Sequence, residues 1–130
     1  MSRFTVVNLR EIAYSGGERA PGIEGGFARK HMDSRDLGIS LWRYAPNVRS
    51  KTAHSHREQE EAYLVIRGSG RILLDDEVQE LREWDVVRVS PEVVRAFEAG
   101  PEGLEIVAVG GPKPAEGDGV PGAAAWPDEQ

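Results

Sequence analysis

Short runs in which apolar and polar residues alternate dominate the chain, and helical periodicity is nearly missing. Runs of this kind that are rich in β-branched and aromatic residues indicate β-strands. We expect strands at Phe4 to Leu9, Gly38 to Tyr44, Glu61 to Ile66, Arg71 to Leu74, Asp85 to Val89, Val93 to Glu98 and Leu104 to Val109. Strands at this spacing predict an all-β fold, either an antiparallel sandwich or a barrel.

Turn-forming residues separate these runs. Gly, Pro, Asp and Ser favour turns because they tolerate or preset the required backbone angles. They gather at Arg67 to Gly70, Asp75 to Glu77, Ser90 to Glu92 and Ala99 to Gly103. No repeat of about 20 to 50 residues is visible, which argues against propellers and solenoids.

Two segments flank the predicted strands. Residues Ala13 to Asp36 are glycine-rich and predict a long loop or extended arm. The segment from Gly110 onward is rich in Gly, Pro and Ala, a composition that cannot bury enough apolar surface to fold alone. Trp126 is its one candidate anchor, and both docking and disorder stay open. We therefore divide the chain into an N-terminal strand and arm (1–36), a core (37–109) and a tail (110–130).

Composition narrows the function classes. The 130 residues are enough for one domain, and the formal net charge of −6 disfavours a nucleic-acid partner. The chain has no cysteine, so a metal would have to be held by imidazole and carboxylate groups. Because we find neither a membrane-spanning apolar run nor a signal peptide, we expect a cytoplasmic protein without a membrane partner.

Two histidines separated by one residue provide the clearest chemical signal. His54 and His56 would present both imidazoles on the same side of a strand. Glu61 begins the next predicted strand and can turn to face them. Two imidazoles and one carboxylate form a facial triad that leaves the other positions on a metal ion open. Alone, such a pair is more often an incidental feature of the surface.

The stretch HSHREQEEAYLVIRGSG (54–70) resembles the first motif of the cupin family. In that motif two histidines one residue apart are followed by a glutamate and then a glycine, which here are His54, His56, Glu61 and Gly68. The resemblance implies a double-stranded β-helix, the jelly-roll barrel that wraps two sheets into a cup. It also implies that the two histidines and the glutamate are metal ligands.

A weaker resemblance to the second cupin motif lies in EWDVVRVSPEVVRAF (83–97), where Asp85, Pro91 and Phe97 fit. Together the two motifs and the strands around them cover Leu37 to Val109. Where the second motif has a histidine, usually the last metal ligand of the family, this chain has Arg95.

The chain also departs from the family at turns. Trp84 and Glu92 stand where the second motif has glycines, and residues Pro46 to Lys51 contain no glycine ahead of the histidine pair.

Arg95 leaves three arrangements open. In the first, His54, His56 and Glu61 bind a metal ion while Arg95 grips an anionic substrate group. In the second, Arg95 pairs with Glu61 or Glu60 and the cup holds no metal. In the third, Arg95 faces solvent; this is disfavoured because Arg95 and Phe97 share a strand face and Phe97 favours burial.

Three further residues are candidates for the cavity. Trp42 and Tyr44 share a strand face and would either line the cup or belong to the core. Tyr63 shares the face of Glu61 and is a candidate substrate contact. His31 lies in a charged stretch, where a lone histidine is usually solvated.

We therefore predict a cupin-like protein that binds a small anionic molecule in its barrel, with Arg95, Tyr63 and Trp42 as substrate contacts. A divalent ion (Fe, Mn, Ni or Zn) held by His54, His56 and Glu61 is the candidate cofactor. The alternative is a metal-dependent oxygenase or isomerase acting on a small carboxylate or sugar-type substrate. We also expect a homodimer, because small jelly rolls can pair through sheet edges.

Overall fold

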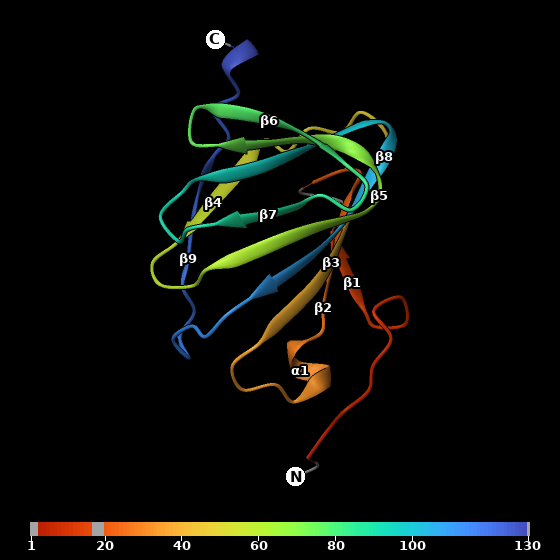
Figure 1. The fold of residues 1–130 in the computed structure, drawn as a ribbon, viewed down its shortest axis with the longest axis vertical. Coiled ribbons are helices and arrows are strands. Elements are labelled where there is room, and N and C mark those ends of the chain that lie inside the picture. Colours follow the sequence, from red (N-terminus) through yellow and green to blue (C-terminus); the bar gives the residue numbers. More distant parts are fainter. Residues whose placement is uncertain (1–2, 17–19, 130) are drawn as a thin grey trace.

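The computed structural model describes residues 3–16 and 20–129. Strands dominate it, as Figure 1 shows. The elements are β1 (Tyr14–Gly16), β2 (Ile23–Phe27), α1 (Arg29–Met32), β3 (Gly38–Tyr44), β4 (Thr52–His56), β5 (Glu61–Leu74), β6 (Glu77–Arg82), β7 (Val86–Val89), β8 (Arg95–Gly110), β9 (Gly119–Ala123) and the 3₁₀ helix η1 (Pro127–Glu129). Neither α1 nor η1 is long enough to cross a bilayer, and the described residues contain no other helix.

The strands form one antiparallel sheet that curls into a barrel (Figure 1). Its main path runs β1-β2-β3-β8-β4-β9, and β5 joins it by pairing with β8 as well as with β6 and β7. The fold class predicted from the sequence is therefore confirmed. Arg95 at the start of β8 pairs with His54 of β4, and the second half of β8 pairs with β3, so β8 links the two sides of the barrel.

The long strands β5 and β8 are antiparallel partners along almost their whole length. Glu61 lies opposite Gly110 and Leu74 lies opposite Arg95, so Glu61 and Arg95 belong to opposite ends of the pair. A flat ribbon of this length would separate them by about 40 Å. In the barrel, however, Nη2 of Arg95 lies 3.9 Å from Oε1 of Glu61. The strand pair must therefore fold back on itself.

The fold-back occurs at two glycines. The register of β5 and β8 shifts near Gly68, and both Gly68 and Gly103 adopt positive φ angles of 78° and 86°. The backbones approach so closely that a methyl group on Gly68 would collide with the carbonyl oxygen of Gly103. The turns predicted at 67–70 and 99–103 are therefore wrong: both segments are bends inside continuous strands, a common role of strand glycines.

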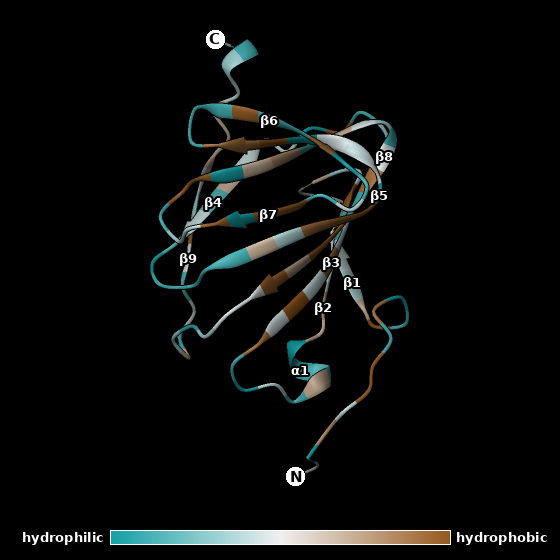
Figure 2. Ribbon diagram, in the orientation of Figure 1, coloured by the Kyte–Doolittle hydropathy of each residue, from teal (hydrophilic) through white to brown (hydrophobic). Residues whose placement is uncertain are grey.

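Apolar side chains fill the barrel between the two halves. The strands carry bands of apolar and polar residues in Figure 2, as a half-buried sheet requires. The main buried cluster consists of Tyr63, Val65, Ile72, Leu81, Val89, Phe97, Ala99, Leu104, Ile106 and Ala108. It packs beneath the cavity described below.

The N-terminal region differs from our expectation in two ways. Residues 4–9 form no strand, and the side chains of Phe4 and Val6 are exposed, so an alternating pattern there did not produce a sheet. The predicted arm at 13–36 instead contains β1, β2 and α1, of which β2 pairs with β3. Residues 17–19 of the arm lie outside the described residues.

The tail docks through one aromatic side chain. Trp126 is 1% exposed, and its Nε1 donates a hydrogen bond of 2.9 Å to the carbonyl oxygen of Ser50. The guanidinium of Arg49 lies over its ring, 4.5 Å from the centroid. Upstream of this anchor, β9 pairs with β4 along its whole length. Of the two alternatives for the tail, docking is therefore the observed one.

An ion-pair network supports this anchor. Arg49 binds the carboxylates of Glu98 and Asp128, and Arg71 also binds Glu98 from the neighbouring strand. Burial alone would raise the pKa of the Glu98 carboxyl, but the hydrogen bonds from Arg49 and Arg71 outweigh it and hold this pKa below its ordinary value. The network joins the tail to both long strands.

The fold-back of β5 and β8 can be tested with a matched pair of glycine substitutions. Gly68→Ala puts an alanine at a positive φ angle, and its methyl group collides with the carbonyl oxygen of Gly103. Together these two costs should lower the free energy of unfolding by about 3 kcal/mol. Gly117 also has a positive φ, of 96°, but a methyl group there would meet nothing within 4 Å. Gly117→Ala should cost only about 1 kcal/mol. Equal losses in urea unfolding would contradict the close approach.

Candidate functional site

His54 and His56 lie on β4 and point to the same side of the sheet. Their rings meet edge to face, with centroids 5.1 Å apart. The His56 side chain is only 11% exposed, whereas that of His54 is 44% exposed. The imidazole of His56 is therefore largely buried, whereas that of His54 is partly open to solvent.

Glu61 begins β5 and faces this pair. Its Oε1 lies 3.6 Å from Nε2 of His54 and 3.0 Å from Nε2 of His56. One potential ligand atom from each of the three residues lies within 4.8 Å of the others. The structure thus brings together the three residues that the sequence suggested as a metal-binding set.

The protonation states of two of these residues suit a cation. Burial raises the pKa of the Glu61 carboxyl, but the neighbouring His54, the hydrogen bond of 2.6 Å from the Tyr63 hydroxyl and the charge of His56 bring it down to about 2. Burial is also the main cause that lowers the pKa of His56, and it outweighs the attraction of Glu61. At neutral pH Glu61 is therefore ionised and His56 is a neutral imidazole with a free lone pair.

The surroundings of His56 also fit a metal ion. Both ring nitrogens of His56 are buried and have no hydrogen-bond partner among the described residues. Its Nε2 faces Glu61, and its Nδ1 lies 3.6 Å from Oδ2 of Asp118. An imidazole between a carboxylate on one side and a metal position on the other is the common arrangement around protein-bound metals. The donor set of two imidazoles and one carboxylate suits Zn, Fe, Mn or Ni.

Arg95 lies at the start of β8, directly opposite His54 on β4, so the two side chains share the inner face. It is completely buried. Its Nη1 and Nη2 donate long hydrogen bonds of 3.3 and 3.4 Å to the carbonyl oxygens of Pro91 and Ser90, and its Nε has no partner among the described residues. The arrangement in which Arg95 faces solvent is therefore excluded.

A cavity of about 670 Å³ opens above these groups. Tyr63 and Trp42 both border it, as does Tyr44. Tyr63 is otherwise part of the core, where its ring meets Phe97 edge to face at 5.0 Å. Trp42 packs against the core and meets Phe27 edge to face, while its Nε1 donates to Oγ of Ser40. The aromatic residues therefore serve as both core and cavity wall.

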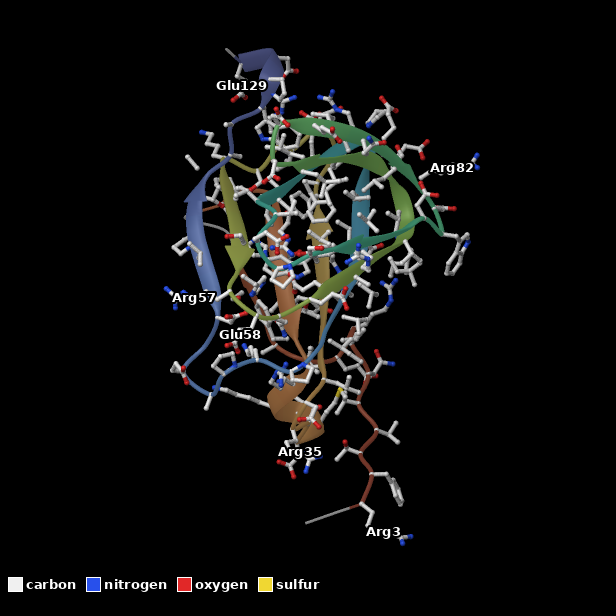
Figure 3. All side chains as sticks on the ribbon, turned by 60° about the vertical axis from the view of Figure 1, so that its left-hand side comes forward. Arg3, Arg35, Arg57, Glu58, Arg82 and Glu129 are labelled. Carbon is white, nitrogen blue, oxygen red and sulfur yellow. The ribbon has the colours of Figure 1, made fainter. Side chains whose placement is uncertain are left out.

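Asp118, which the sequence did not suggest, holds the loop that follows the histidine pair. Its carboxylate is buried and accepts hydrogen bonds of 2.7 to 3.1 Å from the backbone N–H groups of residues 57, 58 and 59. Figure 3 shows Arg57 and Glu58 at the surface beside the tail. Burial raises the pKa of Asp118, but these three N–H groups outweigh it and lower the pKa. Its place in a Gly-rich tail offered no signal for this role.

His31 occupies a different position. It is exposed and borders the outer part of the cavity, with no place in the cluster formed by His54, His56 and Glu61. This agrees with the expectation that His31 is solvated.

The architecture and its contents define a class: a small β-barrel whose cavity contains a cluster of two histidines, a glutamate and an arginine. The profile of the family described as "Cupin domain" matches residues 40–110, more than half of the chain. The chain belongs to the cupin family. No curated protein matches it.

Solved structures of similar fold support this placement. A cupin protein from Bacteroides fragilis is 18% identical and has a TM-score of 0.71, with 88% of this chain and 89% of that chain covered. A variant of Pac13 from Streptomyces with uridine is 16% identical and has a TM-score of 0.76, with 99% and 98% covered; Pac13 is described as a nucleoside dehydratase. Oxalate decarboxylase from Bacillus subtilis is 19% identical, with a TM-score of 0.70, 88% of this chain and 32% of that chain covered.

The role of Asp118 can be tested by hydrogen exchange. Asp118→Ala removes the acceptor of the Glu58 and Gln59 N–H groups, whereas Arg57 keeps a hydrogen bond to the backbone carbonyl oxygen of residue 118, so the amides of Glu58 and Gln59 should exchange about tenfold faster or more. Glu116→Ala removes the same charge from an exposed position two residues earlier and should leave these rates unchanged. Unchanged rates in Asp118→Ala would show that the loop does not depend on this carboxylate.

Proposed function

We propose that the cup binds a small anionic molecule, held by Arg95 and by a divalent metal ion on His54, His56 and Glu61. One observation carries the proposal: three potential ligand atoms lie within 4.8 Å of one another beside a fully buried arginine. The cavity of about 670 Å³ has the size of a typical small-molecule site.

The charges of the site support this combination. A divalent ion about 5 Å from a guanidinium would be repelled by about 6 to 7 kcal/mol at an effective dielectric constant of ~20. That repulsion is close to the whole of a micromolar affinity, about 8 kcal/mol. Two carboxylates, Glu61 and Asp118, lie around His56 and offset it.

Adding these charges gives a simple result. Glu61 and Asp118 contribute two negative charges and Arg95 one positive charge, so the site alone has a net charge of −1. With a divalent ion the net charge becomes +1, which one anionic group of a ligand would neutralise. The pair of cations therefore favours an anion over a neutral molecule.

Each residue then has a distinct part. The metal, when bound, would act as a Lewis acid that polarises an oxygen of the ligand. The hydroxyl of Tyr63 donates a hydrogen bond to Glu61 and keeps that carboxylate aligned with His56. Arg95 supplies an unpartnered N–H donor at the buried end of the cavity, and Trp42 borders the ligand space as an apolar wall.

A second candidate is a metal-dependent enzyme, an oxygenase or isomerase acting on a small carboxylate or sugar-type substrate. The observation that favours it is the number of ligands: three protein donors leave positions on the ion free for substrate. Two proteins of similar fold, oxalate decarboxylase and Pac13, are described as enzymes.

The metal part of the proposal can be tested by elemental analysis of purified protein. We expect a stoichiometric divalent ion in the wild type and its loss in His56→Ala, because that variant removes the most buried ligand. His31→Ala removes the one histidine outside the cluster and should retain the ion. Absence of any ion from the wild type, or its retention in His56→Ala, would refute the metal site.

The anion part can be tested with hexanoate as a probe in calorimetric titrations. Arg95→Met fills a similar volume but removes the charge, so hexanoate affinity should fall about tenfold or more. Arg88 lies on β7 with a side chain that is 65% exposed, and Arg88→Met serves as the control with unchanged affinity. Equal affinities in all three proteins would show that Arg95 does not recognise the anion.

A further inference from the structure

The cavity contains polar nitrogen atoms that the protein leaves without partners. Among the described residues, four buried side-chain atoms lack a hydrogen-bond partner: Nη2 of Arg29, Nδ1 and Nε2 of His56, and Nε of Arg95. All four belong to residues that line this one cavity. Buried polar groups are normally paired, and the two arginine nitrogens can only donate hydrogen bonds, so Nε of Arg95 and Nη2 of Arg29 point to a ligand with acceptor oxygens. His56 and Arg95 belong to the site described above, but Arg29 does not.

The sheet register places Arg29 relative to that site. Glu61, Gly110 and Gly38 lie directly opposite one another on β5, β8 and β3, so all three face the same side of the sheet. Two strand spacings separate Glu61 from Gly38, a distance of about 10 Å. Nη2 of Arg29 would lie 2.7 Å from a Cβ atom on Gly38. The guanidinium therefore occupies the side-chain space of Gly38, in the same row as Glu61.

The missing side chains of this row create the space. A Cβ atom on Gly110 would lie 2.5 Å from Nε2 of Gln59, just as one on Gly38 would meet Arg29. Residues Gln59, Gly110 and Gly38 all border the cavity. Because Gly38 and Gly110 have no side chains, the side chains of Arg29, from α1, and Gln59 occupy the space above them.

Positive charge gathers at this end of the cavity. Arg29, Lys30 and Lys113 border the cavity there; together with His31 we call them the basic rim. Of the described residues that line the cavity, Glu61 alone is acidic. This contrasts with a chain whose formal net charge is −6. Figure 2 shows α1, which carries three of the rim residues, as mostly hydrophilic at one end of the barrel.

Between Glu61 and Gly38 the amide of Gln59 fills the side-chain space of Gly110, and the cavity wall along the strands is apolar. Trp42 and Tyr44 on β3 and Phe97 and Ile106 on β8 all border the cavity. A ligand that spans the cavity would therefore meet charge at both ends and, in between, one amide and a largely apolar wall.

We infer that the ligand of the cup is an elongated dianion with an apolar spacer, one anionic group lying at Arg95 and the metal site and the second at Arg29 in the basic rim. The inference rests on the proposed function, because it adds a second subsite to the same cavity. Arg29 is then the residue that selects dianions over monoanions. Its Nη1 already donates to the carbonyl oxygen of Arg35, which leaves Nη2 for the ligand.

Hexanoate and adipate form a matched pair of probes, because they share a chain length and differ by one carboxylate. In calorimetric titrations we expect the wild type to bind adipate about tenfold or more tightly than hexanoate, since a charged hydrogen bond to Arg29 is added. Arg29→Gln should abolish this preference.

Two further variants make the test specific. Arg35→Gln removes the same charge from a side chain that is 91% exposed and that Figure 3 shows pointing away from the barrel, so the preference for adipate should persist. Gly38→Ala keeps the charge of Arg29 but places a methyl group in the space of its Nη2, so the preference should fall. This second variant keeps the test decisive even where Arg29→Gln fails to fold.

The outcomes separate this inference from the proposed function. Equal affinity of the wild type for hexanoate and adipate, or a preference that survives both Arg29→Gln and Gly38→Ala, would overturn the second subsite while leaving the site at Arg95 intact. A wild type that binds neither probe would overturn both. Loss of the preference in Arg35→Gln as well would show a general charge effect and also overturn the role of Arg29.

Discussion

The fold-back of the β5–β8 pair is the constraint on which the rest of the structure depends. It brings the two ends of one long antiparallel ribbon together, and with them Glu61 and Arg95, which lie at opposite ends of that strand pair. The bend itself lies at Gly68 and Gly103, where two backbones touch because neither residue has a side chain. The electrostatics of the cup therefore depend on a backbone contact in a different part of the barrel.

Arg95 and Glu61 form an ion pair, with Nη2 and Oε1 3.9 Å apart, but among the described residues no hydrogen bond joins their side chains. Arg95 is held mainly by two carbonyl oxygens at long distance, and Glu61 is held by Tyr63 and the histidines. Both groups thus keep part of their hydrogen-bonding capacity. In a buried setting, this arrangement costs stability but leaves fixed dipoles and charges in place for a ligand, which is the physical meaning of preorganisation.

The sequence predicted the centre of the site better than its surroundings. The period of two along a strand was enough to place His54 beside His56 and Arg95 beside Phe97, and the structure buries Arg95 and Phe97 on one face. Glycines misled us at 67–70 and 99–103, since the same residue serves a turn or a bend and only the pairing of distant strands decides which. Asp118 and Arg29 gave no local signal, because their roles arise from contacts across the barrel.

The tail gives β4 a second neighbour. Without β9, the histidine strand would be a sheet edge whose free N–H and C=O groups could pair with another chain. During synthesis β9 emerges after every other strand that the structure describes, so the histidine strand stays unprotected until the barrel is otherwise complete. The sheet edge that carries both histidines is therefore the last one that a newly made chain can cover, and until then its free backbone groups are available to the strand of another chain.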